Sequence, residues 1–417
     1  MKMKTKTKTK KKTQKSQKSQ KVKHKLQNSI RIITINEANN DCKNDMSVYS
    51  DIFKKLGYKI DIHILDTNPK IHIKYAPNPY YDINLFIDRI GPLDFKTKNI
   101  FPSSVNIFAP NVNTFQNYKE LKYIDIVLCN TKECYNFINF IRKENIKKYN
   151  YTFKTYYTNF TTPIPIQLSQ NSTIKKNDLG NKPMRFIHNA NNQKFKNTGS
   201  LIHCWIKYNS KIHSNSVDCE LHVLCNGLCM TTLLLDIKKM YHYDLLNTYK
   251  FETEKDTNTN NTILKYKNLY LYLDLTPNDI KYKELIKNAD VALCTSRKEN
   301  YPHYINTARY FNIFVITMNH SPMNELITNH NDTDTNTNTG SGYLLQKSKV
   351  NKKYYKDTNY RFDETYINIE ELQDSIVWCL DHQSNIRKYS NTTNGRKLFD
   401  NDKKYFENIL KIVLKRL

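Results

Sequence analysis

The pattern of apolar and polar positions predicts strands that alternate with amphipathic helices from residue 29 onward. Residues Ile30–Asn36 form a continuous apolar run, and residues 58–65 alternate between apolar and polar side chains, as strands do. Between them, apolar residues at helical spacing follow Asp45, which we expect to cap a helix that ends at Gly57. Further apolar runs predict strands at 83–87, 105–110 and 124–129. Strands that alternate with helices are typical of a doubly wound parallel sheet.

The same alternation resumes at residue 184, after a polar stretch that we interpret as a linker. The second set of strands is predicted at 184–190, 220–226, 268–275, 291–295 and 313–318. Helices are predicted around Leu201, at 303–310, at 323–327, after Asn368 and over the last segment, and low-complexity loops at 250–261 and 330–339. The resulting domain plan is a tail at 1–28, a first domain at 29–165, a linker at 166–182, a second domain at 183–390 and a C-terminal helix at 391–417.

Two of the predicted strand-to-helix junctions lie close together between residues 289 and 327. Each junction places a helix N-terminus at the carboxyl edge of a strand, where open parallel sheets bind ligands and free N–H groups attract phosphate. The residues there, Glu299–Arg309 and then Pro322–Glu325, resemble the donor-site signature of retaining GT-B glycosyltransferases. The branch of that superfamily that is most similar has the pattern E-G-F-G-H-Y-x-N-E-A-R followed by P-P-M-N-E.

The resemblance implies an α/β fold of the GT-B type, with two Rossmann-like doubly wound domains facing a cleft and a C-terminal helix that packs back on the first domain. It implies transfer of a sugar from a nucleotide-sugar donor, with retention of configuration, to a glycan or protein acceptor bound by the first domain. No metal ion and no cofactor besides the nucleotide sugar are expected. The resemblance makes Glu299 and His303 the candidate catalytic residues. The candidate donor-binding residues come from the loop before Leu201 and from the two predicted helices at 303–310 and 323–327: Lys194, Lys196, Tyr304, Asn306, Thr307, Met323, Asn324 and Glu325.

The sequence departs from the family pattern at three positions of the signature. Thr307 stands where the second of two donor-binding glutamates is expected, and Asn300 and Pro302 replace two glycines. Because a carboxylate makes charge-assisted hydrogen bonds about twice as strong as those of a neutral hydroxyl, we expect weaker or altered nucleotide binding at Thr307. A catalytically impaired GT-B-fold protein that binds a glycan or a protein is therefore the alternative function.

Some candidate residues also have a simpler interpretation. Lys194 and Lys196 lie in a lysine-rich loop at a helix start, where they would either neutralise a diphosphate or stay in solvent. Asn324 and Glu325 would either reach the donor or cap their own short helix. Asp332 and Asp334 lie in an Asn/Thr/Asp repeat, so we do not expect them to bind a metal ion.

The formal net charge of +26 is unevenly distributed along the 417 residues. Residues 1–27 hold twelve lysines and no acidic residue, so the rest of the chain carries +14. A segment of this composition cannot bury enough apolar surface to fold. It would either stay solvated or bind an anionic partner such as nucleic acid or a membrane surface. A nucleic-acid-binding protein is the third function considered, although no helix-turn-helix or zinc-finger spacing supports it.

Cysteine and glycine usage narrow the class of protein further. The nine cysteines include no C-x-x-C pair, which suits a reducing compartment, and the expected location is the cytoplasm. We expect no transmembrane segment and no secretory signal, since no apolar run is long enough and no apolar region follows the basic N-terminus. The turn at 36–44 lacks glycine, which argues against an NAD-dependent dehydrogenase. The richness in Asn, Lys, Ile and Tyr suggests an AT-rich genome, such as that of a giant virus or a protist.

Overall fold

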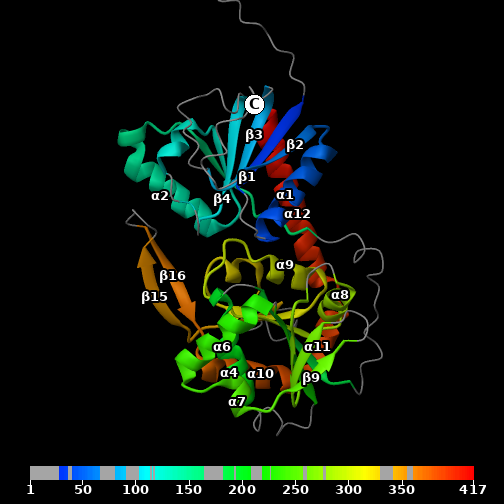
Figure 1. Ribbon diagram of the computed structural model, residues 1–417. Coiled ribbons are helices and arrows are strands. Elements are labelled where there is room, and N and C mark those ends of the chain that lie inside the picture. Colours follow the sequence, from blue (N-terminus) through cyan, green and yellow to red (C-terminus); the bar gives the residue numbers. More distant parts are fainter. Residues whose placement is uncertain are drawn as a thin grey trace, which may run out of the picture.

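A computed structural model shows two parallel β-sheets, one in each domain of a two-domain molecule (Figure 1). The structure describes residues 28–35, 40–65, 80–90, 103–112, 115, 118–163, 182–191, 194–207, 218–225, 227–256, 261–275, 279–328, 341–354 and 360–417. All but the last residue of the predicted tail, all but the last residue of the predicted linker, and the Asp332–Asp334 repeat therefore lie outside the described residues.

The first domain contains a six-stranded sheet in which all strands are parallel. The strands, in the spatial order β2-β1-β3-β4-β5-β6, are β1 (Ser29–Ile35), β2 (Lys59–Leu65), β3 (Tyr81–Asp88), β4 (Ser103–Pro110), β5 (Ile126–Cys129) and β6 (Lys154–Tyr157). Helix α1 (Asn40–Lys55) packs Ile52 and Phe53 on the apolar face that includes Ile30 and Ile32. Helix α2 (Lys132–Tyr149) packs Phe137 on the opposite face, and a short 3-10 helix, η2 (Tyr118–Tyr123), precedes β5.

The second domain contains an eight-stranded sheet that is parallel except at one end. Its strands, in the spatial order β14-β13-β12-β7-β8-β11-β10-β9, are β7 (Met184–Asn191), β8 (Cys219–Cys225), β9 (Glu252–Lys255), β10 (Thr262–Tyr266), β11 (Leu269–Tyr272), β12 (Val291–Cys294), β13 (Phe314–Met318) and β14 (Gly342–Leu345). The four central strands are almost completely buried, as expected for a parallel sheet with helices on both faces.

The helices of the second domain surround this sheet. They are α4 (Thr198–Lys207), α6 (Gly227–Tyr241), α7 (Leu245–Thr248), α8 (Ile280–Lys287), α9 (His303–Tyr310), α10 (Ile369–Asp381), α11 (Gln383–Ser390) and α12 (Asn394–Lys415), with the 3-10 helices η4 (Lys194–Lys196) and η5 (Met323–Leu326). A separate two-stranded hairpin consists of β15 (Lys349–Tyr354) and β16 (Arg361–Tyr366). No helix in the described part of the chain is long and apolar enough to cross a membrane.

Every strand predicted from the sequence is present, but two local predictions are wrong. Asp45 does not cap α1, because the helix already begins at Asn40. Residues 250–261 are not simply a loop, since they include β9, whose side chains are all exposed. A fully exposed strand has no alternation of apolar and polar positions, so the pattern could not reveal it.

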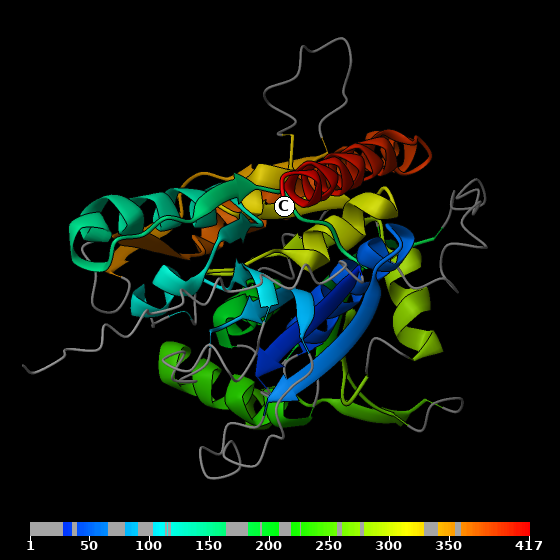
Figure 2. The ribbon, with the colours of Figure 1, turned by 90° about the horizontal axis from the view of Figure 1, so that it is seen from above.

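The C-terminal helix α12 runs from the second domain to the first, as the resemblance implied (Figure 1). Seen from above, it lies alongside α9 (Figure 2). Its Phe406 ring packs 5.6 Å from Tyr49 of α1 and 4.9 Å from Phe160 (centroid distances). Near its end, the Arg416 guanidinium donates a hydrogen bond of 3.1 Å to the Tyr156 hydroxyl of β6.

Candidate active site

The candidate site lies at the carboxyl ends of β7 and β12, two parallel neighbours in the middle of the second sheet. A partly open hollow lies there, with a cavity volume of about 10 Å³. Loops and helix starts from both βα junctions supply its lining, which consists of His188, Asn189, Lys196, Leu293, Cys294, Ser296, Glu299, Pro302, Tyr304, Ile305 and Met323. Four of the residues predicted from the sequence, Lys196, Glu299, Tyr304 and Met323, are therefore brought together in one cavity.

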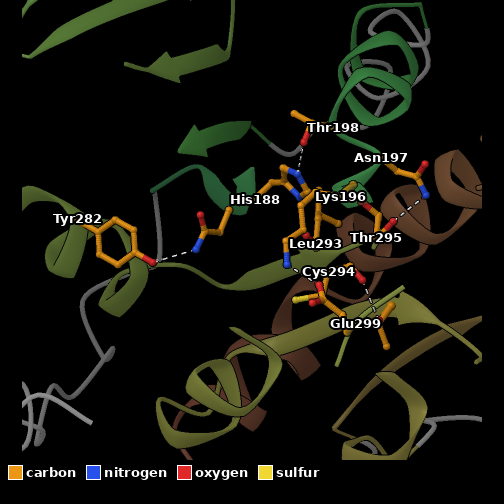
Figure 3. A network of polar contacts seen from close by, with 11 residues as sticks. His188, Lys196, Asn197, Thr198, Tyr282, Leu293, Cys294, Thr295 and Glu299 are labelled. Atoms are coloured by element: carbon orange, nitrogen blue, oxygen red, sulfur yellow. Dashed lines mark hydrogen bonds and ion pairs between the residues drawn. The ribbon is translucent and has the colours of Figure 1, made fainter. Parts of the chain in front are cut away.

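Lys196 and Glu299 form an ion pair inside this cavity (Figure 3). Their side chains are 14% and 12% exposed, so both charges are largely removed from water. A charge in such a place needs an opposite charge or several hydrogen bonds, and loss of one partner leaves the other uncompensated. A ligand that carries negative charge could replace Glu299 as the partner of Lys196.

His188, near the end of β7, is buried and lines the cavity. Figure 3 shows its place in the polar network beside Thr198 and Leu293. Its Nδ1 lies 2.7 Å from the Leu293 carbonyl oxygen and its Nε2 lies 2.9 Å from the Thr198 hydroxyl. A carbonyl only accepts, so Nδ1 carries the proton and Nε2 accepts from Thr198. Burial lowers the pKa of His188 to about 4, so the imidazole is neutral near pH 7.

The Tyr304 hydroxyl is a buried polar group with no hydrogen-bond partner among the described residues. Burial raises the pKa of Tyr304 well above its usual value, so the phenol keeps its proton. An unpaired buried hydroxyl costs free energy unless a ligand or a water satisfies it. Tyr304 also lines the cavity, but its hydroxyl oxygen has almost no accessible surface there.

His303 and Asn306 do not line the cavity but lie in a polar network between the two domains. His303 Nε2 is 3.0 Å from an Asp45 carboxylate oxygen, and its Nδ1 is 3.1 Å from the Thr162 hydroxyl. The Asn306 amide donates to Thr162 (3.2 Å) and to the Tyr301 hydroxyl (3.0 Å), and its oxygen accepts from Arg309 (2.9 Å).

The hydrogen bonds of this network can all be donated in one direction, from Asn306 toward Asp45. If the Asn306 amide donates to Thr162, the Thr162 hydroxyl can donate to His303, and His303 can donate to Asp45. His303 and Asn306 therefore join the first domain to α9.

The remaining candidate residues also contact protein groups. The Thr307 hydroxyl donates to the His303 carbonyl one helical turn back, at 2.9 Å. The Asn324 amide donates to the Asn319 side chain at 2.9 Å. One Glu325 carboxylate oxygen accepts from the Lys132 backbone N–H at the start of α2 (2.9 Å), and the other accepts from the Ser321 hydroxyl.

Lys194 lies in η4, but its side chain is outside the described part of the structure. Sequence reasoning missed His188, Asn189 and Ser296 as lining residues. The sequence could have identified them by their position, since they lie at or just after the ends of the predicted strands β7 and β12, next to the predicted phosphate loop. Among the described residues, no group of three or more His, Cys, Asp or Glu side chains is arranged to hold a metal ion.

No protein-family model matches the chain, and no curated protein matches it either. Solved structures do match over nearly the whole chain. A glycosyltransferase from Rickettsia africae has a TM-score of 0.54 and 13% identity, covering 93% of this chain and 98% of that one. A sucrose-phosphate synthase from Thermosynechococcus elongatus has a TM-score of 0.54 and 10% identity, covering 93% and 98%.

An Escherichia coli structure described as trehalose-6-phosphate bound with UDP-2-fluoro glucose has a TM-score of 0.54 and 10% identity, covering 93% and 99%. These likenesses agree with the two Rossmann-like domains and with the helix that returns to the first of them. The chain has the GT-B fold of glycosyltransferases.

Proposed function

We propose that the chain transfers a sugar from a nucleotide-sugar donor to a glycan or protein acceptor, with retention of configuration and without a metal ion. The observation that carries the proposal is the Lys196–Glu299 ion pair in a cavity at the carboxyl edge of the second sheet. Similar structures include one bound with UDP-2-fluoro glucose, which is a nucleotide sugar.

The chemistry assigned to this cavity is electrostatic. As the bond between the sugar and the diphosphate breaks, the diphosphate leaves with the electron pair and gains negative charge. An acceptor hydroxyl oxygen bonds to the anomeric carbon, and its proton passes to the leaving diphosphate. Lys196 would exchange Glu299 for that diphosphate and stabilise it in the transition state. Glu299, released from the lysine, would then accept hydrogen bonds from sugar hydroxyls. The fixed cavity would contribute by holding donor and acceptor in a reactive orientation.

The direct test is a panel of nucleoside diphosphates and nucleotide sugars screened by thermal shift with the full chain. A ligand present at 100 times its dissociation constant stabilises the folded state by about 2.7 kcal/mol, which raises the melting temperature measurably. Glu299→Gln and Lys196→Met are the matched variants, because each removes the charge of a different member of the ion pair. If no member of the panel stabilises the wild-type protein, the proposed transferase function is wrong.

The second candidate is a GT-B-fold protein that binds a glycan or a protein without turnover. It is favoured by Thr307, whose hydroxyl is bound to its own helix, and by Glu325, whose carboxylate contacts α2 of the first domain. Thr307→Glu distinguishes the two candidates, with Thr307→Gln as the uncharged control. A large gain in turnover for Thr307→Glu alone supports an enzyme weakened at this position. Absence of donor binding by all three proteins supports the binding function.

A further inference from the structure

The hairpin formed by β15 and β16 belongs to neither parallel sheet, yet it lies between the two domains (Figure 1). All residues of β15 are exposed. In β16, by contrast, Glu364 and Thr365 are only 3% and 2% exposed. Strand β16 is therefore the side of the hairpin that is packed against the rest of the protein.

The base of the hairpin is bonded to the loop that follows β12. The Thr365 backbone N–H and hydroxyl both donate to the Arg297 carbonyl oxygen, at 3.1 and 3.2 Å. The Arg297 guanidinium donates to the Asn197 side-chain oxygen at 2.6 Å and lies 4.5 Å from the centroid of the Tyr366 ring. The Asn197 amide in turn donates to the Thr295 carbonyl at 2.8 Å. The hairpin, the β12 loop and the start of α4 thus form one hydrogen-bonded unit.

These bonds fix the backbone on both sides of the cavity. Asn197 directly follows Lys196, and Arg297 is two residues before Glu299. Asn197 is buried and has a left-handed backbone with φ of 56°. Asparagine tolerates this conformation better than most residues, and unlike glycine it also supplies an amide. The side chain of Asn197 therefore helps to set the spacing between Lys196 and Glu299.

Tyr360, the residue directly before β16, contacts the first domain. The Tyr360 ring lies 5.2 Å from Phe137 and 5.2 Å from Phe140 of α2, between ring centroids. Lys298, next to Arg297, interacts electrostatically with Glu133 in the first turn of α2. Burial lowers the pKa of Lys298 to about 8, and Glu133 opposes this shift. The ring contact of Tyr360 and the electrostatic interaction of Lys298 therefore link the hairpin and the β12 loop to the same helix of the first domain.

We propose that the hairpin is a positioning element that transmits the packing of the first domain to the loops of Lys196 and Glu299, with Arg297 as the positioning residue. This inference rests on the proposed function, because the loops that it orders are those assigned to the donor. When α2 holds Tyr360, β16 is fixed and Arg297 keeps both loops in place. When α2 moves away, Thr365 and Arg297 lose that support.

The test is Tyr360→Ala in the full chain, with two measurements. The first is amide hydrogen exchange at Arg297, whose N–H donates to the Phe195 carbonyl at 2.7 Å. We expect exchange at least about tenfold faster than in the wild type, which corresponds to about 1.4 kcal/mol. The second is steady-state transfer, for which we expect kcat to fall about tenfold while the donor KM changes by less than about threefold. Loss of preorganisation affects the transition state more than substrate binding.

Two control variants separate positioning from general loss of the hairpin. Tyr360→Phe keeps the ring between Phe137 and Phe140, so it should restore both wild-type values. Tyr354→Ala removes a ring that is 59% exposed on the opposite strand, so it should change neither value.

Unchanged exchange at Arg297 in Tyr360→Ala would overturn the inference, and so would equal effects of Tyr360→Ala and Tyr354→Ala. If exchange responds as expected but no nucleotide sugar binds the wild type, the coupling through the hairpin is supported and the proposed transfer function fails.

Discussion

Because His188 is buried, the stability of the second domain should fall at acidic pH. The pH range of this fall is set by the lowered pKa of the His188 imidazole. The imidazole is fully buried and neutral, with its two nitrogens bonded to Leu293 and Thr198. Its pKa of about 4 in the folded protein lies below the ordinary value of about 6.5 that applies when the chain is unfolded. Between these two values the unfolded chain binds a proton that the folded protein does not bind. Stability contributed by the neutral histidine is therefore complete above about pH 6.5 and is lost as the pH falls toward 4.

The size of this loss of stability follows from the pKa shift of His188. Each pKa unit corresponds to about 1.4 kcal/mol, so the full loss is about 3 kcal/mol. Urea unfolding followed by tryptophan fluorescence measures the free energy of unfolding at pH 7 and at pH 4.5. Both tryptophans, Trp205 and Trp378, lie in the second domain. His188→Asn keeps a donor toward Leu293 but has no imidazole to protonate. We expect it to be less stable than the wild type at pH 7 and to lose about 2–3 kcal/mol less on acidification.

Thr198→Val is the matched control for this experiment. It removes the hydrogen bond to Nε2 but leaves the imidazole buried, so it should keep most of the pH dependence because burial is the main cause of the pKa shift. If His188→Asn and the wild type lose equal stability between pH 7 and pH 4.5, the assignment of a neutral buried histidine is refuted.

Two further predictions concern the cavity and the sheet. Lys196→Met should weaken binding of a nucleoside diphosphate at least about tenfold in calorimetric titration, because the diphosphate loses its charged partner; equal affinity would remove Lys196 from the donor site. Gly342→Ala should lower the free energy of unfolding by about 1–3 kcal/mol, because a Cβ at that position would lie 2.2 Å from the Val315 carbonyl oxygen of the neighbouring strand. A denaturation midpoint equal to that of the wild type would show that β14 shifts freely.

The sequence is sufficient to place Lys196 and Glu299 at the same edge of the second sheet, where its parallel strands end. Both residues follow the carboxyl ends of parallel strands, and such ends meet at one edge whatever the details of packing. It was not sufficient for His303 and Asn306. Three residues apart on α9, they share one face of that helix, but only the position of the first domain decides whether this face meets the cavity or Thr162.

The β15–β16 hairpin could not be predicted either, and the reason is different. Strand β15 is exposed along its length and rich in lysine, so its composition resembles that of a loop. Its partner β16 buries Glu364 and Thr365, which are polar residues that carry no periodic apolar signal. Elements that are held by contacts distant in the chain, such as Tyr360 with Phe137, are visible only when the domains are seen together.

The return of α12 to the first domain has a consequence for the synthesis of the protein. Phe406 packs between Tyr49 and Phe160, so the core of the first domain includes a ring that is translated after the whole second sheet. During elongation, that core must wait with an apolar gap until residue 406 leaves the ribosome. Nascent chains released before this point would expose apolar side chains of the first-domain core, which makes them targets for chaperones and proteases.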